Sequence, residues 1–142
     1  MIGFNVTDVK FNLKNKQVYK KWLTAIIENE GKKAGDISYV FCSDEYLLDL
    51  NKQYLNHDTY TDIITFDYAE GNKTSGDIFI SIDRVKENAG KFNVTFEEEL
   101  LRVMAHGVLH LMGYKDKKSG DISIMRSKEE ESIEMFNNFI LK

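Results

Sequence analysis

The chain has 142 residues, 42% of them hydrophobic, which is enough to bury the core of one domain, so we expect residues 1–142 to form a single domain. The formal net charge of −4 excludes a protein that coats nucleic acid through bulk electrostatics, so any such contact has to be local. No apolar run approaches the roughly 20 residues of a membrane span, the lone Cys42 excludes an internal disulfide, and the start lacks a signal-peptide pattern, so we expect a cytoplasmic protein without membrane contact.

Hydrophobic periodicity predicts strands and helices in alternation. In chain order, the patterns predict one or two extended segments over 2–6 and 9–13, a helix at 16–30, a strand at 37–42, a helix with Ser43 as its N-cap, strands at 62–66 and 77–82, a short helix at 83–91, and longer helices at 95–112 and 121–140. Strands mixed with helices in this order are typical of an α+β domain, here with a small mixed sheet packed with about five helices.

The helix at 95–112 is the best defined of these elements. Thr95 followed by Glu98 is a capping-box pattern, and Gly113 is typical of the residue just after a helix. The helix is apolar nearly all round, so we expect it to be the central buried helix of the domain. Its apolar residues are Leu100, Leu101, Val103, Met104, Ala105, Val108, Leu109, Leu111 and Met112.

Two histidines on this helix predict a metal site. His106 and His110 are four residues apart, so they lie within roughly 40° of each other on one helix face and both rings can reach one ion. The alternative is a pair of core histidines satisfied by hydrogen bonds. Two imidazoles in so apolar a helix are costly without a shared partner, which favours metal ligation.

Two glycines refine this interpretation. Gly107 costs about 1 kcal/mol relative to alanine inside a helix, which indicates that another group passes close to the backbone there. Gly113 lets the chain turn back and brings Asp116 towards the same ion. The spacing of His106, His110, Gly113 and Asp116 is that of the metzincin proteases, with Asp116 at the position of their third histidine. Three protein ligands with one open position are typical of a catalytic metal.

Two other metalloenzyme classes fit the pattern less well. A metzincin-like protease needs a glutamate directly after the first histidine as its general base, and this chain has Gly107 there. Two histidines and one carboxylate also match the facial triad of non-haem iron oxygenases, but that triad usually lies on a β-barrel and not on one helix.

The run from His106 to Tyr114 resembles the signature of the YbeY endoribonucleases, a family of small bacterial metalloproteins linked to ribosomal RNA maturation and ribosome quality control. The resemblance includes Asn51 to Tyr54, and Thr61 to Phe66 is similar to the family segment TDVLSF. Gly76-Asp77-Ile78 is similar to its GDI strand, and Met125 with Glu129 to its C-terminal helix. Together these segments cover most of the chain from about Asp44 onward.

The chain departs from the family pattern at two positions. Lys115-Asp116 stands where the family has Asp-His, so the third zinc ligand would be a carboxylate. Such a site holds one Zn²⁺ per chain and tolerates Mn²⁺ or Fe²⁺ better than a site of three histidines. Leu55 stands where the family has an arginine in its presumed RNA cleft, so a phosphate contact is missing there.

Four further residues are candidates for catalytic or supporting roles. His57, in the loop before Thr61, is a candidate general base, although a lone loop histidine is more often only exposed. Thr61 and Asp62 are candidates for orienting substrate or the metal ligands, or else for capping a turn. Glu129 falls on an apolar stripe, where a carboxylate needs a partner, so we expect it near the metal or at the solvent edge of its helix.

The resemblance implies a single-strand-specific metallo-endoribonuclease that acts in 3'-end maturation of small-subunit rRNA and in ribosome quality control. The partners would be single-stranded RNA, small-subunit rRNA, and the ribosome or its proteins. A ribosome-associated assembly factor, whose metal mainly holds the fold together, is the alternative, and Leu55 favours it modestly.

Overall fold

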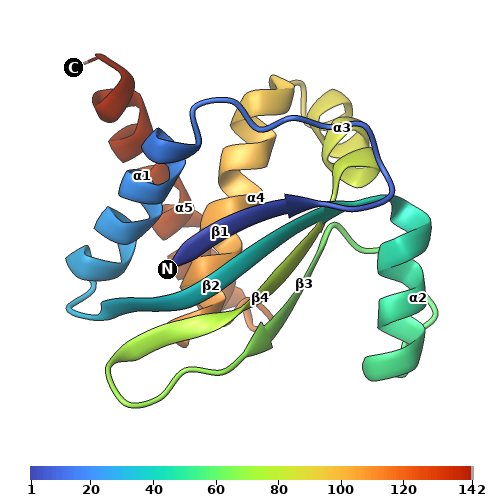
Figure 1. Cartoon of the computed structure of the whole chain (residues 1–142), viewed down its shortest axis with the longest axis horizontal. Helices are drawn as coiled ribbons and strands as arrows, with labels where there is room; N and C mark the ends of the chain where they lie inside the picture. Colours follow the sequence, from blue (N-terminus) through green and yellow to red (C-terminus); the bar gives the residue numbers. More distant parts are fainter. Residues whose placement is uncertain (142) are drawn as a thin grey trace.

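The fold is built on a four-stranded mixed sheet with strand order β1-β2-β4-β3. The computed structural model describes residues 1–141 (Figure 1). The strands β1 and β2 are parallel, β2 and β4 are parallel, and β3 is antiparallel to β4. The strand bounds are Ile2–Val6 for β1, Lys33–Cys42 for β2, Ile63–Asp67 for β3 and Lys73–Ser81 for β4.

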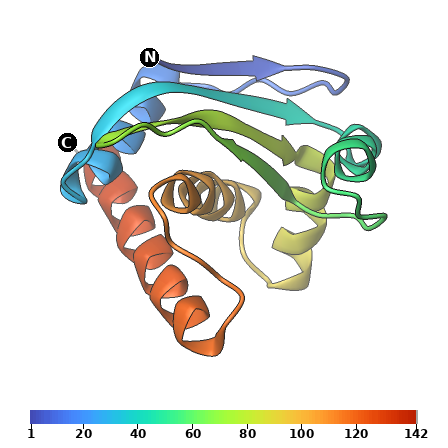
Figure 2. The ribbon, with the colours of Figure 1, turned by 90° about the horizontal axis from the view of Figure 1, so that it is seen from below.

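Five helices accompany the sheet within residues 1–141. Figure 2 shows the strands as one layer, with α1, α3, α4 and α5 on the same side of it. Helix α2 lies at one end of the sheet, where Leu47 packs with Cys42 and Ile64. This arrangement confirms the α+β class with a small mixed sheet. The helix bounds are Lys16–Asn29 for α1, Asp44–Tyr54 for α2, Ile82–Lys91 for α3, Phe96–Leu111 for α4 and Ser119–Leu141 for α5.

Side-chain caps fix the starts of the helices that surround the site. The Thr95 hydroxyl accepts a hydrogen bond from the Glu98 amide at 3.1 Å at the start of α4, and Ser43 does the same for Tyr46 at the start of α2. The predicted caps at Thr95 and Ser43 are therefore confirmed. Gly113 follows α4 with a φ of 101°, a conformation that glycine adopts without strain.

Helix α4 is the centre of the core, as predicted. Ten of its residues are buried between the sheet and the other helices. The Tyr39 hydroxyl of β2 donates a hydrogen bond to the Met104 carbonyl at 2.7 Å, which fixes α4 against the sheet. Two of the helices around α4 are also joined to each other, because the Trp22 indole of α1 donates a hydrogen bond to the Ser132 carbonyl of α5 at 2.6 Å. His106 and His110 thus lie on the helix at the centre of the core.

Of the one or two extended segments predicted near the start, 2–6 forms the strand β1, and 9–13 is not a strand. After Val6 the chain leaves the edge of the sheet and runs across to α1. The apolar side chains that gave the alternating pattern still pack. Leu13 is buried, and the Phe11 ring lies 5.0 Å from that of Phe41. The alternation of apolar and polar residues therefore indicated a half-buried segment, and such a segment need not pair with a strand.

The sequence places Ile122, Met125, Ile133, Phe136 and Ile140 on one apolar stripe of the last helix, but the buried part of this stripe is shorter. Met125, Ile133 and Phe136 are buried on α5, but Ile122 and Ile140 are 46% and 56% exposed. These two residues flank the part of α5 that packs against α4. Ile122 instead lines the cavity described below.

Gly107 marks a close approach of α4 to the sheet. A Cβ atom there would meet Ile78 Cγ2 at 2.9 Å and Ile63 Cδ1 at 3.0 Å. The inference that another group passes close to this backbone is thus confirmed, and the group is the sheet. Because Gly107 has no side chain, α4 packs close to the sheet, and the two histidines line a cavity together with residues of β3.

We expect Gly107→Ala to destabilise the protein by up to about 2 kcal/mol. The added methyl overpacks the buried Ile78 and the partly buried Ile63, which typically costs about 1 to 3 kcal/mol, and the better helix propensity of alanine returns about 1 kcal/mol of this. Urea unfolding measures the change. Gly90→Ala on α3 is the matched control, because nothing lies within 4 Å of its added Cβ, and it should be neutral or stabilising. A Gly107→Ala protein as stable as the Gly90→Ala protein would contradict the close approach.

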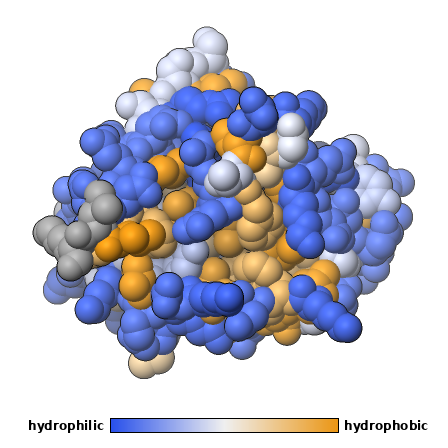
Figure 3. All heavy atoms as spheres, turned by 90° about the horizontal axis from the view of Figure 1, so that it is seen from above, coloured by the Kyte–Doolittle hydropathy of each residue, from blue (hydrophilic) through white to orange (hydrophobic). Residues whose placement is uncertain are grey.

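No helix within residues 1–141 combines the length and the apolar composition that crossing a bilayer requires. On the face shown in Figure 3, polar side chains cover most of the surface and the apolar ones gather in a band near its centre.

Candidate metal centre

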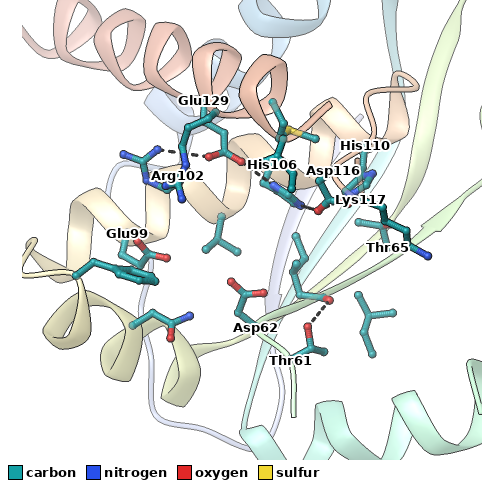
Figure 4. Close-up of a pocket in the computed structure, with 18 of the residues that line it drawn as sticks. Thr61, Asp62, Thr65, Glu99, Arg102, His106, His110, Asp116, Lys117 and Glu129 are labelled. Carbon is teal, nitrogen blue, oxygen red and sulfur yellow. Dashed lines mark hydrogen bonds and ion pairs between the residues drawn. The ribbon is translucent and has the colours of Figure 1, made fainter. Parts of the chain in front are cut away.

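Three side chains meet at the C-terminal end of α4. His106 and His110 lie one turn apart, with ring centroids 4.7 Å from each other. The chain reverses at Gly113, where its amide donates to the His110 carbonyl at 3.0 Å, and this reversal returns Asp116 to the histidines. The Asp116 Oδ2 atom lies 3.1 Å from His106 Nε2 and 3.3 Å from His110 Nε2. Figure 4 shows the three side chains converging on one point.

The donor atoms are spaced as a small transition-metal ion requires. One atom from each of His106, His110 and Asp116 lies within 4.8 Å of the others. Ligand atoms about 2.1 Å from a tetrahedral ion are about 3.4 Å from one another, close to the observed separations from Asp116. Two imidazole nitrogens and one carboxylate oxygen suit zinc and tolerate manganese or iron. The three side chains are half-buried, which leaves one side of the group open to the solvent.

Glu129 of α5 forms a hydrogen bond with His106 on the ring nitrogen that faces away from Asp116. Its Oε2 atom lies 2.6 Å from His106 Nδ1, and only 5% of Glu129 is exposed. This bond assigns the proton to Nδ1, so Nε2 presents its lone pair to the same point as His110 and Asp116. Burial lowers the pKa of His106, but the hydrogen bond and charge of Glu129, together with the charges of Asp116 and Asp62, raise it overall. The buried partner that the sequence required for Glu129 is therefore His106.

Arg102 balances the charge of Glu129. One of its guanidinium nitrogens lies 3.4 Å from Glu129 Oε1, and the other lies 2.5 Å from Glu130 Oε1. Arg102 is one turn before His106 on α4, so a single helix presents both the metal ligand and the cation that holds its supporting carboxylate. The pairing places a positive charge beside the carboxylate that accepts the hydrogen bond of His106.

We expect Glu129→Gln to weaken metal binding by about 10-fold to 100-fold. The amide loses the negative charge that raises the basicity of His106, and supporting carboxylates of this kind typically contribute that much to affinity. Competition with a chromophoric chelator measures the change. Glu130→Gln is the matched control, since it removes a carboxylate that also pairs with Arg102 but does not touch a histidine. Equal losses in both variants would assign the effect to Arg102 instead.

The metal ligands open onto a cavity of about 750 Å³. Its walls come from the segment before β3, from β3 itself, and from α3, α4 and α5 (Figure 4). Thr61 and Asp62 form one wall, facing the ligands on α4. Burial raises the pKa of Asp62, and the nearby charge of His106 opposes this shift. Positive side chains are also present: Arg102, Lys117 and Arg126.

The structure brings most of the predicted site residues together. His106, His110, Asp116, Glu129, Thr61 and Asp62 all line the cavity. His57 does not: it is exposed in the loop after α2, with its amide donating to the Asn51 carbonyl at 3.1 Å. Leu55 lines the cavity and is 43% exposed, so the position at which the family resemblance places an arginine does face the site.

Sequence reasoning missed Glu99 and Arg102. Glu99 precedes His106 by seven residues, so the two share a face of α4, and Arg102 precedes it by four. Extending the face of the two histidines back along the helix would have found both. Glu99 instead looked like one of three consecutive acidic residues at a helix start, where negative charge is ordinary.

The chain is similar to known proteins along nearly its whole length. The family model described as "Endoribonuclease YbeY" matches residues 2–137. A protein of Flavobacterium johnsoniae with that name is 58% identical over 137 residues, which cover 96% of this chain and 98% of that one. One of Parabacteroides distasonis is 50% identical over 93% of both chains. The solution structure of a Thermotoga maritima protein matches with a TM-score of 0.64 and 30% identity, covering 96% of this chain and 89% of that one.

Proposed function

Since this chain belongs to the endoribonuclease YbeY family, we propose that it hydrolyses phosphodiester bonds in single-stranded RNA with one metal ion held by His106, His110 and Asp116. The observation that carries the proposal is the position of these ligands. They converge from two segments at the wall of a large cavity and leave one side open. A metal that only held the fold together would need four protein ligands and no open side.

The side chains around the ligands have distinct tasks in the proposed reaction. A bound Zn²⁺ supplies a water of lowered pKa and polarises a phosphoryl oxygen, as would Mn²⁺ or Fe²⁺. Glu129 holds the proton on His106 Nδ1 and fixes the ring. Lys117 and Arg126 face the cavity and attract the phosphates of the chain. Asp62 and Thr61 orient the reacting groups from the opposite wall.

The side chains that line the cavity favour single-stranded RNA over a duplex. Leu55, Phe92 and Ile122 line it and are all at least 43% exposed, so apolar and aromatic surface is available beside the charged groups. Splayed bases of single-stranded RNA stack on such side chains, whereas the bases of a duplex are already stacked and enclosed. The net charge of −4 agrees with this local mode of binding.

The proposed cellular role is 3'-end maturation of small-subunit rRNA and ribosome quality control in the cytoplasm, with the ribosome or its proteins as partners. The names of the relatives support the nuclease part of this role. The second candidate is an assembly factor that binds rRNA without cutting it. Leu55 favours it, since an apolar side chain faces the cavity where the family resemblance places a phosphate contact.

Incubation of the protein with purified small-subunit rRNA separates the two candidates. The nuclease should cut the RNA, stop when a chelator removes the metal, and resume when Zn²⁺ is restored. If the fully metal-loaded protein bound the rRNA without cutting it, the nuclease would be excluded and the assembly factor would be the supported function. A duplex of the same sequence is the control for strand specificity.

We expect Leu55→Arg to raise cleavage by roughly ten-fold or more. A charge-assisted bond to phosphate in a partly dry cavity contributes about 1.5 to 3 kcal/mol, and Leu55 already faces the cavity. The gain should shrink as salt rises. Initial rates on a labelled single-stranded oligonucleotide measure it. Leu55→Gln is the control for side-chain length without charge, and an equal gain in both variants would exclude a phosphate contact.

A further inference from the structure

One group in the cavity has no role in holding the metal ligands. Glu99, in the first turn of α4, is only 4% exposed, yet its carboxylate lines the cavity. Within residues 1–141, its carboxylate makes no hydrogen bond or ion pair, and Figure 4 draws none. The side chain is thus enclosed by the protein while its carboxylate, which has no protein partner, faces the cavity, so a donor that enters the cavity can bind it.

The surroundings of Glu99 are those of an aromatic ligand. Phe92 caps the C-terminus of α3 and lines the cavity with a ring that is 56% exposed. Asn88 is four residues earlier on the same helix and lines the cavity too, so its amide lies on the same side as the Phe92 ring. An exposed aromatic ring next to a polar edge is the combination that binds a flat, hydrogen-bonding base.

The distance from the metal ligands suits a neighbouring nucleotide. Glu99, His106 and His110 share a face of α4, with Glu99 about two turns, or roughly 10 Å, before His106. Figure 4 shows Glu99 towards one end of the cavity and the metal ligands towards the other, with Asp62 across from both. A strand lying along α4 would place a phosphate at the histidines and a base near Glu99.

We propose that Glu99, Asn88 and Phe92 form a nucleobase subsite that selects guanine in the RNA strand; this inference rests on the proposed function. An ionised carboxylate only accepts hydrogen bonds. Guanine alone among the four bases presents two adjacent donors, N1–H and the N2 amino group, on its Watson–Crick edge. Adenine and cytosine present one amino donor beside a ring nitrogen that would repel the second oxygen.

The electrostatics of Glu99 agree with a role in binding donors. Burial raises the pKa of Glu99, and the charges of Asp62 and Glu129 raise it further, while Arg102 and Arg126 oppose them. The ionised form is therefore destabilised in the empty cavity. Two N–H donors from guanine would relieve this destabilisation, which makes the binding of guanine stronger than that of a base with one donor.

The test uses mononucleotides, which contain no phosphodiester bond to cut. The zinc-loaded protein is titrated with the 5'-monophosphates of guanosine, inosine, adenosine and cytidine, and binding is followed by NMR. Guanosine monophosphate should bind roughly ten-fold tighter than the adenosine and cytidine forms, and inosine, which lacks the N2 amino group, should lie between them. The shared phosphate contributes equally to all four.

Glu99→Gln should reduce the guanine preference to within about two-fold, because the amide replaces one acceptor with a donor. Glu97→Gln, an exposed position on the same helix turn, is the matched control and should keep the preference. Phe92→Ala should weaken all four nucleotides alike. Glu99→Gln should melt no lower than the parent, since the carboxylate has no protein partner to lose.

Equal binding of the four nucleotides by the parent protein would overturn the subsite, and so would a guanine preference that survives in Glu99→Gln. Cleavage of uridine-rich oligonucleotides with a single guanine is measured in parallel. If no oligonucleotide is cut, the proposed nuclease function fails, whereas the nucleotide titrations still decide whether the subsite exists.

Discussion

Replacing His110 with alanine is expected to reduce bound metal to far below one ion per chain and to reduce RNA cleavage by about 1,000-fold or more. The variant keeps His106 and Asp116 from the group of three, and two ligands rarely hold zinc. Without the ion, no water of lowered pKa is available near neutral pH. Elemental analysis of the dialysed protein measures the occupancy, and cleavage of a labelled oligonucleotide measures the activity.

His57→Ala is the matched control for the loss of an imidazole. The His57 side chain is exposed and does not line the cavity, so the variant should bind as much metal as the parent. Its cleavage rate separately tests the prediction that His57 is a general base. Full metal occupancy in His110→Ala would remove the proposed site, whatever the rate of cleavage.

Replacing Asp116 with alanine should weaken metal binding by about 100-fold or more, because it removes the only anionic ligand of the group. The carboxylate contacts both histidines, so its loss also leaves their mutual orientation less fixed. In contrast, Asp116→His should keep the ion and shift the preference from manganese towards zinc, since it supplies a third imidazole. Competition between the two ions, followed by elemental analysis, measures this shift.

Asp121→Ala controls for the loss of a nearby carboxylate. Asp121 lies in the first turn of α5, five residues beyond Asp116, and does not belong to the group of ligand atoms. Its alanine variant should bind metal like the parent. If Asp116→Ala retained metal while Asp121→Ala lost it, the third ligand would be Asp121.

The sequence predicted the elements whose signals are local. The capping residues and Gly113 gave both ends of α4 because a helix terminates through contacts within a few residues. The starts of β2 and β4 came out too late, since Lys33 and Lys73 pair with each other across the sheet and show no apolar alternation. The pairing of strands far apart in the chain is information that periodicity does not contain.

In the site too, the residues that are close together in the sequence were the ones that could be predicted. His106, His110 and Asp116 lie within eleven residues, so spacing on one helix and one turn was enough to bring them together. Glu129 was found because a carboxylate on an apolar stripe needs a partner, although the sequence did not name His106. His57 is close to Thr61 in the chain but outside the cavity, because nearness along a loop does not fix the direction of a side chain.

The most direct test of the account is a titration of the metal-free protein with Zn²⁺, in which bound metal and cleavage of single-stranded RNA are measured on the same samples. We expect the cleavage rate to rise in proportion to the bound metal and to stop rising at one ion per chain. The His110→Ala protein should show neither the binding nor the rate. A full rate in the metal-free protein would contradict the account, and so would full occupancy that raised the melting temperature without any cleavage.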